Sequence, residues 1–175
     1  MDTSSEGNKF LLRTDLTDAE NREIAAYHEA GHAVSAWILE FGIGEVAIRR
    51  KGGGHTCIGT TLDELRSRIE ELQLQRRSAI HSLAGICAEK QFRPDVLPDG
   101  GIDDLARVNR AIDKIVRLSD VGDYDETRTE IQEATRQLVN QHWARISALA
   151  GELLVTPILA GPDAVRIIKS ADAPM

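Results

Sequence analysis

Two histidines and one glutamate near residue 30 have the spacing of a metal-dependent hydrolase. His28 and His32 are four residues apart, so on a helix their imidazoles lie on one face and can reach the same cation. Glu29 projects about 100° further round the helix, where its carboxylate can take a proton from a metal-bound water. This is the His-Glu-x-x-His signature of zinc hydrolases, with Glu29 as the predicted catalytic base. Chance would produce only about 0.01 such motifs in a chain of this composition.

The residues around the motif also favour a metal site. Within residues 24–39, these three side chains are the ionisable groups expected to matter near neutral pH. A helix that is apolar all round is expected to be buried. Because an unpaired buried carboxylate is costly, the three polar groups need a shared partner, and a bound cation supplies it.

A third ligand must come from elsewhere, because a catalytic zinc ion takes three protein ligands and keeps one position open for water. Two aspartates at the start of a later helix are the natural candidates. Asp104 lies at the edge of the apolar face of that helix, which turns inward. Asp103 shares its face with basic side chains, and we expect it to be solvated and to cap the helix. The periodicity favours Asp104, and other carboxylates stay open as alternatives.

The elements that position these residues are predicted to be mainly helical. Thr17 and Glu20 have the spacing of a capping box, which predicts a helix from there to about residue 40. Two short strands, 45–50 and 56–59, are expected around a glycine turn. Further helices are expected over 61–92, with a candidate break near 75–77, and over 104–118, 125–155 and 161–168. The predicted fold is mainly α with one small β-ribbon.

These elements are expected to form one domain. Residues 1–16 are predicted to be a flexible arm, residues 17–169 the domain, and residues 170–175 a tail. The sequence shows no internal repeat.

The composition excludes several other functions. The 175 residues carry a net charge of −7, which argues against nucleic acid or an anionic membrane as partner. No stretch approaches the roughly 18 apolar residues of a membrane span, and the N-terminus lacks the pattern of a signal peptide. The run Gly52–Gly54 is not followed by the Lys-Ser/Thr pair of a phosphate loop, so no ATPase of its own is expected. Two cysteines cannot build a disulfide framework, which favours a cytoplasmic location.

Several segments resemble the FtsH family of ATP-dependent zinc metalloproteases. The motif segment Ala-Tyr-His-Glu-Ala-Gly-His-Ala resembles the zinc motif of that family, and the similarity extends over about residues 17–169. The other similar segments are the glycine-containing strand region 49–60, the helix Leu83–Glu89, the segment Gly101–Leu105 and the closing region 153–168. The ATPase module and transmembrane segments of the family have no counterpart here, and Ile86 stands where the family usually has Arg.

The resemblance implies a role for each site residue. It implies zinc as the cofactor, one ion per chain, with His28, His32 and Asp104 as ligands and Glu29 as the base. Glu89 matches a family glutamate near the metal, which would orient a ligand imidazole; its alternative interpretation is an ordinary polar helix residue. The family forms six-membered rings, so a homo-oligomer is a further expectation, with a monomer or dimer left open.

The sequence therefore predicts a zinc endopeptidase that acts on peptides or unfolded proteins. The strand residues Val46, Ala47, Ile48 and Arg49 are predicted to hold an extended peptide by edge pairing. Folded substrates would need an unfoldase supplied in trans. The alternative is a catalytically silent zinc-binding module that regulates or binds a partner. His55 and His81 are interpreted as a turn residue and an ordinary helix residue.

Overall fold

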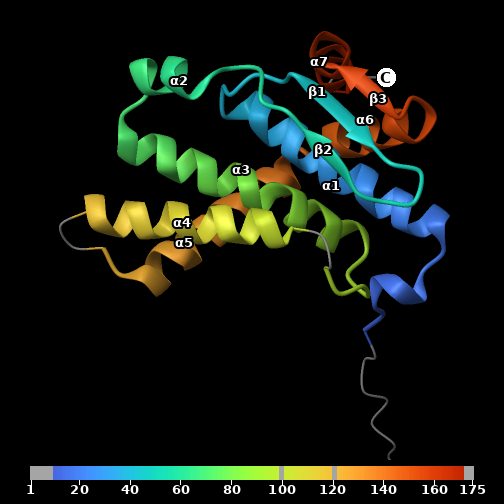
Figure 1. The fold of residues 1–175 in the computed structure, drawn as a ribbon, viewed down its shortest axis with the longest axis horizontal. Coiled ribbons are helices and arrows are strands. Elements are labelled where there is room, and N and C mark those ends of the chain that lie inside the picture. Colours follow the sequence, from blue (N-terminus) through green and yellow to red (C-terminus); the bar gives the residue numbers. More distant parts are fainter. Residues whose placement is uncertain (1–9, 99–100, 120–121, 172–175) are drawn as a thin grey trace, which may run out of the picture.

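The computed structural model describes residues 10–98, 101–119 and 122–171. It is mainly helical with a small antiparallel sheet (Figure 1), which confirms the predicted fold class. After a 3-10 turn at Arg13–Asp15, the elements in chain order are α1 (Asp18–Ile38), β1 (Glu45–Ile48), β2 (Gly54–Thr56), α2 (Leu62–Arg68), α3 (Glu71–Phe92), α4 (Ile102–Leu118), α5 (Tyr124–Gln141), α6 (Trp143–Val155), β3 (Ile158–Ala160) and α7 (Gly161–Ser170). No helix in the described ranges combines the length and apolar character needed to cross a bilayer.

Helix α1 occupies the centre of the fold. The sheet and α7 lie on one side of it, and α3, α4 and α5 lie on the other (Figure 1). Thr17 begins the helix through the predicted capping box: its hydroxyl accepts from the Glu20 N–H, and the Glu20 carboxylate accepts from the Thr17 N–H. Residues 24–36 are buried except Tyr27, which is half-buried, so the helix is buried almost all round, as its apolar composition predicts.

Close packing between α1 and α3 depends on a glycine inside the motif. A Cβ at Gly31 would lie 2.7 Å from the Ala84 carbonyl oxygen and 2.8 Å from the Ala88 Cβ. Both distances are shorter than real side chains tolerate, so only glycine lets the two helices approach this closely. The approach brings the face of α1 that carries His28 and His32 directly against α3.

The sheet has the strand order β2-β1-β3, and both pairings are antiparallel. Val46 lies opposite Thr56 on one side and Leu159 on the other. The first strand begins at the predicted residue but ends at Ile48 rather than at Arg50, and the second spans Gly54–Thr56 rather than 56–59. Strand β3 was not predicted, because three residues between two prolines are too few to show a strand pattern.

Two predicted helices are each divided in the structure. The stretch 61–92 breaks at Ile69 and Glu70 rather than near 75–77. Ile69 is extended there and packs against the cluster of Phe41, Leu65 and Leu74, so tertiary packing overrides helix propensity. The stretch 125–155 divides at His142, whose backbone leaves the helical region.

The two ends of the chain are partly described. Leu11 of the predicted arm forms a parallel bridge with Val96, and residues 1–9 lie outside the described residues. Of the predicted tail, Ser170 ends α7 and residues 172–175 lie outside the described part of the chain.

Candidate metal centre

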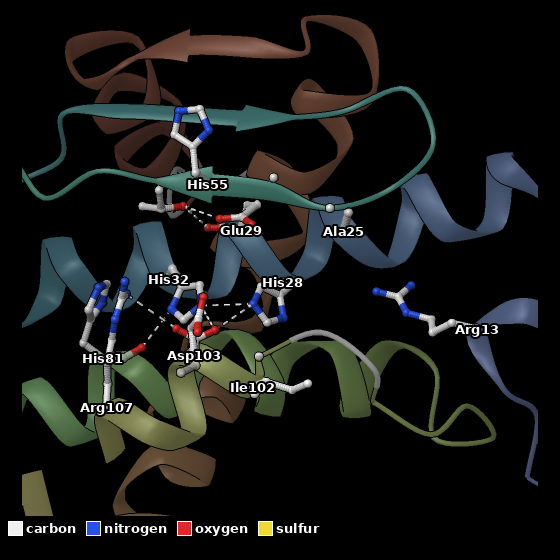
Figure 2. Close-up of a pocket in the computed structure, with 15 residues that line it drawn as sticks. Arg13, Ala25, His28, Glu29, His32, His55, His81, Ile102, Asp103 and Arg107 are labelled. Atoms are coloured by element: carbon white, nitrogen blue, oxygen red, sulfur yellow. Dashed lines mark hydrogen bonds and ion pairs between the residues drawn. The ribbon is translucent and has the colours of Figure 1, made fainter. Parts of the chain in front are cut away.

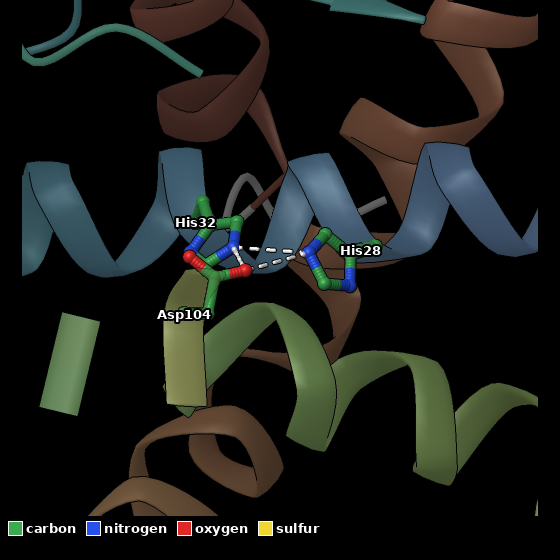
Figure 3. Close-up of side chains that lie close together, drawn as sticks. All are labelled: His28, His32 and Asp104. Atoms are coloured by element: carbon green, nitrogen blue, oxygen red, sulfur yellow. Dashed lines mark hydrogen bonds and ion pairs between the residues drawn. The ribbon is translucent and has the colours of Figure 1, made fainter. Parts of the chain in front are cut away.

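Three side chains from α1 and α4 meet at one point (Figure 3). His28 Nε2 lies 3.1 Å from His32 Nε2, and each of these nitrogens lies 3.3 Å from Asp104 Oδ2. Both histidines are buried, and Asp104 is half-buried. The structure thus brings together the two motif histidines and the aspartate favoured by the periodicity of its helix. Asp103 is exposed and does not cap α4, because Gly101, with a φ of 95°, occupies the N-cap position.

The spacing of the three atoms fits a tetrahedral zinc ion. Zinc bonds to nitrogen and oxygen are about 2.0–2.2 Å long, so ligand atoms around it lie roughly 3.3–3.6 Å apart. The two 3.3 Å distances to Asp104 Oδ2 match this range, and the 3.1 Å between the imidazole nitrogens is slightly shorter. Glycine leaves room beside them: a Cβ at Gly85 of α3 would lie 2.7 Å from His32 Cδ2 and 2.9 Å from His28 Nε2. The donor set and this space therefore suit a single divalent cation.

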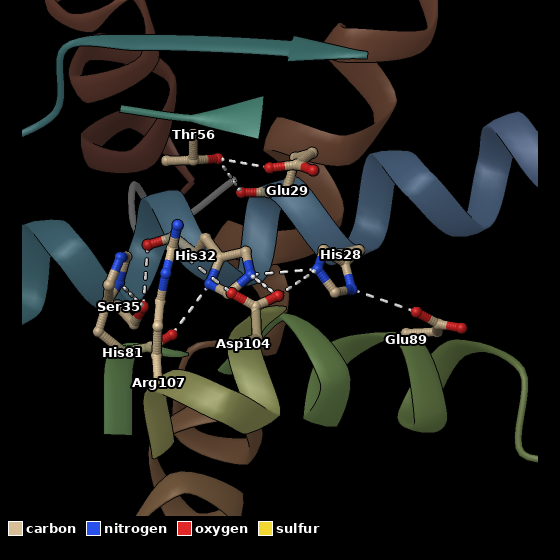
Figure 4. Close-up of polar contacts among 9 residues, drawn as sticks. All are labelled: His28, Glu29, His32, Ser35, Thr56, His81, Glu89, Asp104 and Arg107. Carbon is tan, nitrogen blue, oxygen red and sulfur yellow. Dashed lines mark hydrogen bonds and ion pairs between the residues drawn. The ribbon is translucent and has the colours of Figure 1, made fainter. Parts of the chain in front are cut away.

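Each imidazole is held from behind by a second contact (Figure 4). His32 Nδ1 lies 2.9 Å from the His81 carbonyl oxygen, which can only accept, so Nδ1 carries the hydrogen and Nε2 is left with a lone pair. His28 Nδ1 lies 3.1 Å from Glu89 Oε2, and a carboxylate there favours the same tautomer. Three acceptor atoms then face one another, an arrangement that requires a shared cation or proton.

When no metal is bound, a proton on His28 lies between the facing acceptor atoms, as the charges around the cluster indicate. Burial lowers the pKa of His28, but hydrogen bonds with Asp104 and Glu89 and the charge of Glu29 outweigh it and raise the pKa to about 9. Burial raises the pKa of Asp104, and the two imidazoles outweigh it and hold this pKa below its usual range. A metal ion must therefore displace a proton at neutral pH.

Glu29 lies on the side of α1 that faces β2. Its side chain is buried, and Oε2 accepts a 2.9 Å hydrogen bond from the Thr56 hydroxyl. Gly54 makes room for it, since a Cβ there would lie 2.7 Å from Glu29 Cγ. Glu29, Thr56 and the three clustered side chains line one pocket of about 700 Å³ (Figure 2). The cluster and the Glu29 carboxylate thus border the same space.

The predicted peptide-binding strand requires a correction. Val46, Ala47 and Ile48 form β1, which is the central strand, so β2 and β3 already pair with both of its edges. Arg49 follows the strand and donates its N–H to the Gly53 carbonyl. The edge strand beside the pocket is β2, which lies between β1 and the clustered side chains in Figure 2. Edge pairing by β1 was predicted because β3, which pairs with its other edge, was not.

Several residues of the site were not identified from the sequence as part of it. His81 contributes its backbone carbonyl to His32, and its ring nitrogen Nδ1 lies 3.0 Å from the Ser35 hydroxyl. Burial and the charge of His32 lower the pKa of His81 to about 3, so the ring is neutral. Thr56 binds Glu29, and Gly85 provides space. No local spacing marks these contacts, because each joins elements distant in sequence; His55, by contrast, is exposed in β2 and pairs with Glu45.

Comparison with known proteins gives a partial relative. The chain is 31% identical over 106 residues to the mitochondrial inner membrane m-AAA protease component YTA10 of Saccharomyces cerevisiae. The match covers 59% of this chain and 14% of the yeast protein, so the chain spans a small part of that relative. No protein-family model matches the chain. The candidate metal centre thus belongs to a chain distantly related to a protease component.

Proposed function

We propose that this protein is a zinc metalloendopeptidase of the FtsH type. The observation that carries the proposal is the meeting of His28, His32 and Asp104 at ligand spacing, in the pocket that also contains Glu29. Three protein ligands beside an open pocket are typical of a catalytic zinc site, whereas structural zinc sites usually have four. The similarity to a protease component supports the same reaction class.

The chemistry proposed for the site divides between the metal and the chain. When bound, zinc would lower the pKa of a coordinated water and polarise the scissile carbonyl. Glu29 Oε2 is held by the Thr56 hydroxyl, and we assign the other oxygen, Oε1, to take a proton from the attacking water. Glu29 then delivers this proton to the leaving amine. Low solvent exposure of the carboxylate strengthens its interaction with the water.

The proposed substrate is a peptide or an unfolded protein in extended form. Strand β2 is an edge strand beside the pocket, and no other strand of the described residues pairs with its outer edge, so a substrate strand can pair with it through main-chain hydrogen bonds. Such pairing recognises the backbone and tolerates many side chains. Folded substrates would need an unfoldase that acts in trans. A homo-oligomer of this chain could receive substrate from such an unfoldase. Nucleic acid and membrane are not among the proposed partners.

The test combines zinc analysis with peptide digestion. Purified protein is expected to contain one zinc per chain and to cleave casein, and Glu29→Gln should retain the zinc while losing the cleavage. Glu23→Gln is the matched control, because Glu23 is an exposed glutamate on the same helix. His28→Ala should lose the zinc. If Glu29→Gln cleaves casein as fast as the wild type, or if zinc-loaded wild-type protein cleaves nothing, the enzymatic proposal is wrong; the second result would favour a zinc-binding regulatory module.

A further inference from the structure

Glu89 places a carboxylate in the interior behind the metal centre. The residue is 1% exposed, and its Oε2 contacts His28 Nδ1 at 3.1 Å. Its other oxygen, Oε1, is buried and has no hydrogen-bond partner among the described residues. A buried carboxylate with an unsatisfied oxygen is costly unless a positive charge lies nearby. The contact that holds His28 in place therefore depends on whatever compensates Glu89.

Arg13 supplies this compensation from the N-terminal arm. Its Nε lies 3.6 Å from Glu89 Oε1, an ion pair between two side chains that are 13% and 1% exposed. The guanidinium lines the same pocket as the metal centre and points toward His28 in Figure 2. Figure 4 shows Glu89 on the far side of His28 from Asp104, so Arg13, Glu89 and His28 form a chain of contacts that ends at the metal-binding nitrogen.

The arm that carries Arg13 is fixed to the domain at two further places. The Leu11 N–H donates to the Asp95 carbonyl at 2.9 Å, and the Leu97 N–H donates to the Leu11 carbonyl at 2.9 Å. The Asn21 side chain, on α1, donates to the Arg13 carbonyl at 3.1 Å. These bonds hold the backbone of residue 13, and the guanidinium itself donates from Nη1 to Asn21 Oδ1 at 3.4 Å, so it is held beside α1 within reach of Glu89.

We propose that Arg13 is a positioning residue of the metal centre. It acts through Glu89: the guanidinium stabilises the buried carboxylate in the place where it holds the His28 ring, which keeps Nε2 directed at the metal. The arm is thereby part of the metal centre rather than an appendage. This inference rests on the proposed zinc site, but not on the proposed peptidase activity.

The experiment measures zinc affinity of the full chain by competition with a chromophoric chelator. Glu89→Gln removes the charged acceptor of His28 and is expected to weaken zinc binding by roughly 10–100-fold, the usual range for such partners. Arg13→Gln is expected to weaken it by about 10-fold. Arg13→Lys keeps the charge and should stay within about threefold of wild type, since the pair at 3.6 Å relies on charge rather than on a directed hydrogen bond. Arg110→Gln, which removes an exposed arginine of α4, is the charge-matched control and should leave the affinity unchanged.

The double variant distinguishes positioning from a general structural role. If Arg13 acts through Glu89, Arg13→Gln should cost nothing further in the Glu89→Gln background, and the two losses should not add. Equal losses in both backgrounds would overturn the proposal, as would unchanged affinity of Arg13→Gln. Tighter zinc binding by Arg13→Gln would also overturn it, because the guanidinium would then act only by repelling the metal. Thermal unfolding of the metal-free variants shows whether any loss comes from the fold. Absence of zinc binding by the wild type would refute the metal centre itself.

Discussion

Replacement of Gly85 by alanine tests whether the space beside the two imidazoles is required for the metal. In most helix interiors this change stabilises a protein by about 1 kcal/mol, because alanine is the better helix former. At Gly85 the new Cβ would lie 2.9 Å from His28 Nε2 and still closer to His32 Nε2. Ordinary contact between such atoms is about 3.5 Å, so His28 Nε2 would have to retreat by roughly 0.6 Å.

This retreat exceeds what a metal site tolerates. Zinc–ligand distances vary by only about 0.2 Å in well-formed sites, and both imidazoles are displaced together. We therefore expect Gly85→Ala to weaken zinc binding by more than about 100-fold, beyond the range typical of residues that contact a ligand from behind. The metal-free protein should also forfeit the usual gain of about 1 kcal/mol, since displaced rings weaken their contacts with Glu89 and the His81 carbonyl.

The assay compares three glycine-to-alanine variants by chelator competition and by urea unfolding. Gly151→Ala on α6 has no heavy atom within 4 Å of the new Cβ, so it should gain about 1 kcal/mol and bind zinc as wild type does. Gly31→Ala should lose stability, because its Cβ would meet the backbone of α3. Wild-type zinc affinity in Gly85→Ala would show that the metal does not sit between these imidazoles, and the proposed site would have to be abandoned.

Three further measurements follow from individual contacts. Because the folded pKa of His28 is about 9, zinc binding at pH 7 should release about one proton from His28, and the zinc affinity should rise roughly tenfold per pH unit until pH 9. Calorimetry in buffers of different ionisation enthalpy measures the number of protons released. Binding without proton release would contradict the raised pKa. Thr56→Val should lower kcat/KM about 10-fold with zinc affinity unchanged, while Thr56→Ser keeps the hydroxyl and should keep the wild-type rate. Equal rates for the wild type and both variants would show that the hydrogen bond to Glu29 does not contribute to catalysis. Burial raises the pKa of the Cys87 thiol to about 11, so about one molecule in a thousand carries the thiolate at pH 8, and iodoacetamide should label exposed Cys57 first; rapid labelling of Cys57→Ser would contradict this.

The parts of the site that sequence could predict are those with local signals. The i, i+4 spacing placed both histidines on one face of α1, and the capping box located the start of that helix. Periodicity also distinguished Asp104 from Asp103, because the apolar stripe of α4 continues over several turns. Each of these signals lies within a single element and so can be read without knowledge of the fold.

The parts that could not be predicted depend on contacts between distant segments. Thr56 reaches Glu29 across 27 positions, and His81 reaches His32 across 49. The role of β1 was misread for the same reason, since its central position follows from pairing with β3 at the other end of the chain. Arg13 lies in a segment with no periodicity, and contacts that no local pattern predicts bring it to the site: the bridge between Leu11 and Val96 and the hydrogen bond from the Asn21 side chain.

The proposed ligands come from two helices that are far apart in the chain, since His32 and Asp104 are 72 positions apart. An unfolded chain therefore offers a metal only the local histidine pair, and the third ligand joins when α4 docks. Because zinc would bind the complete site more tightly, it would stabilise the state in which α4 is docked. The free energy of that state would fall by about 2.7 kcal/mol when the free metal concentration is a hundredfold above its dissociation constant. The ion would act as a cross-link that forms after folding, and its loading would report that assembly of the helices is complete.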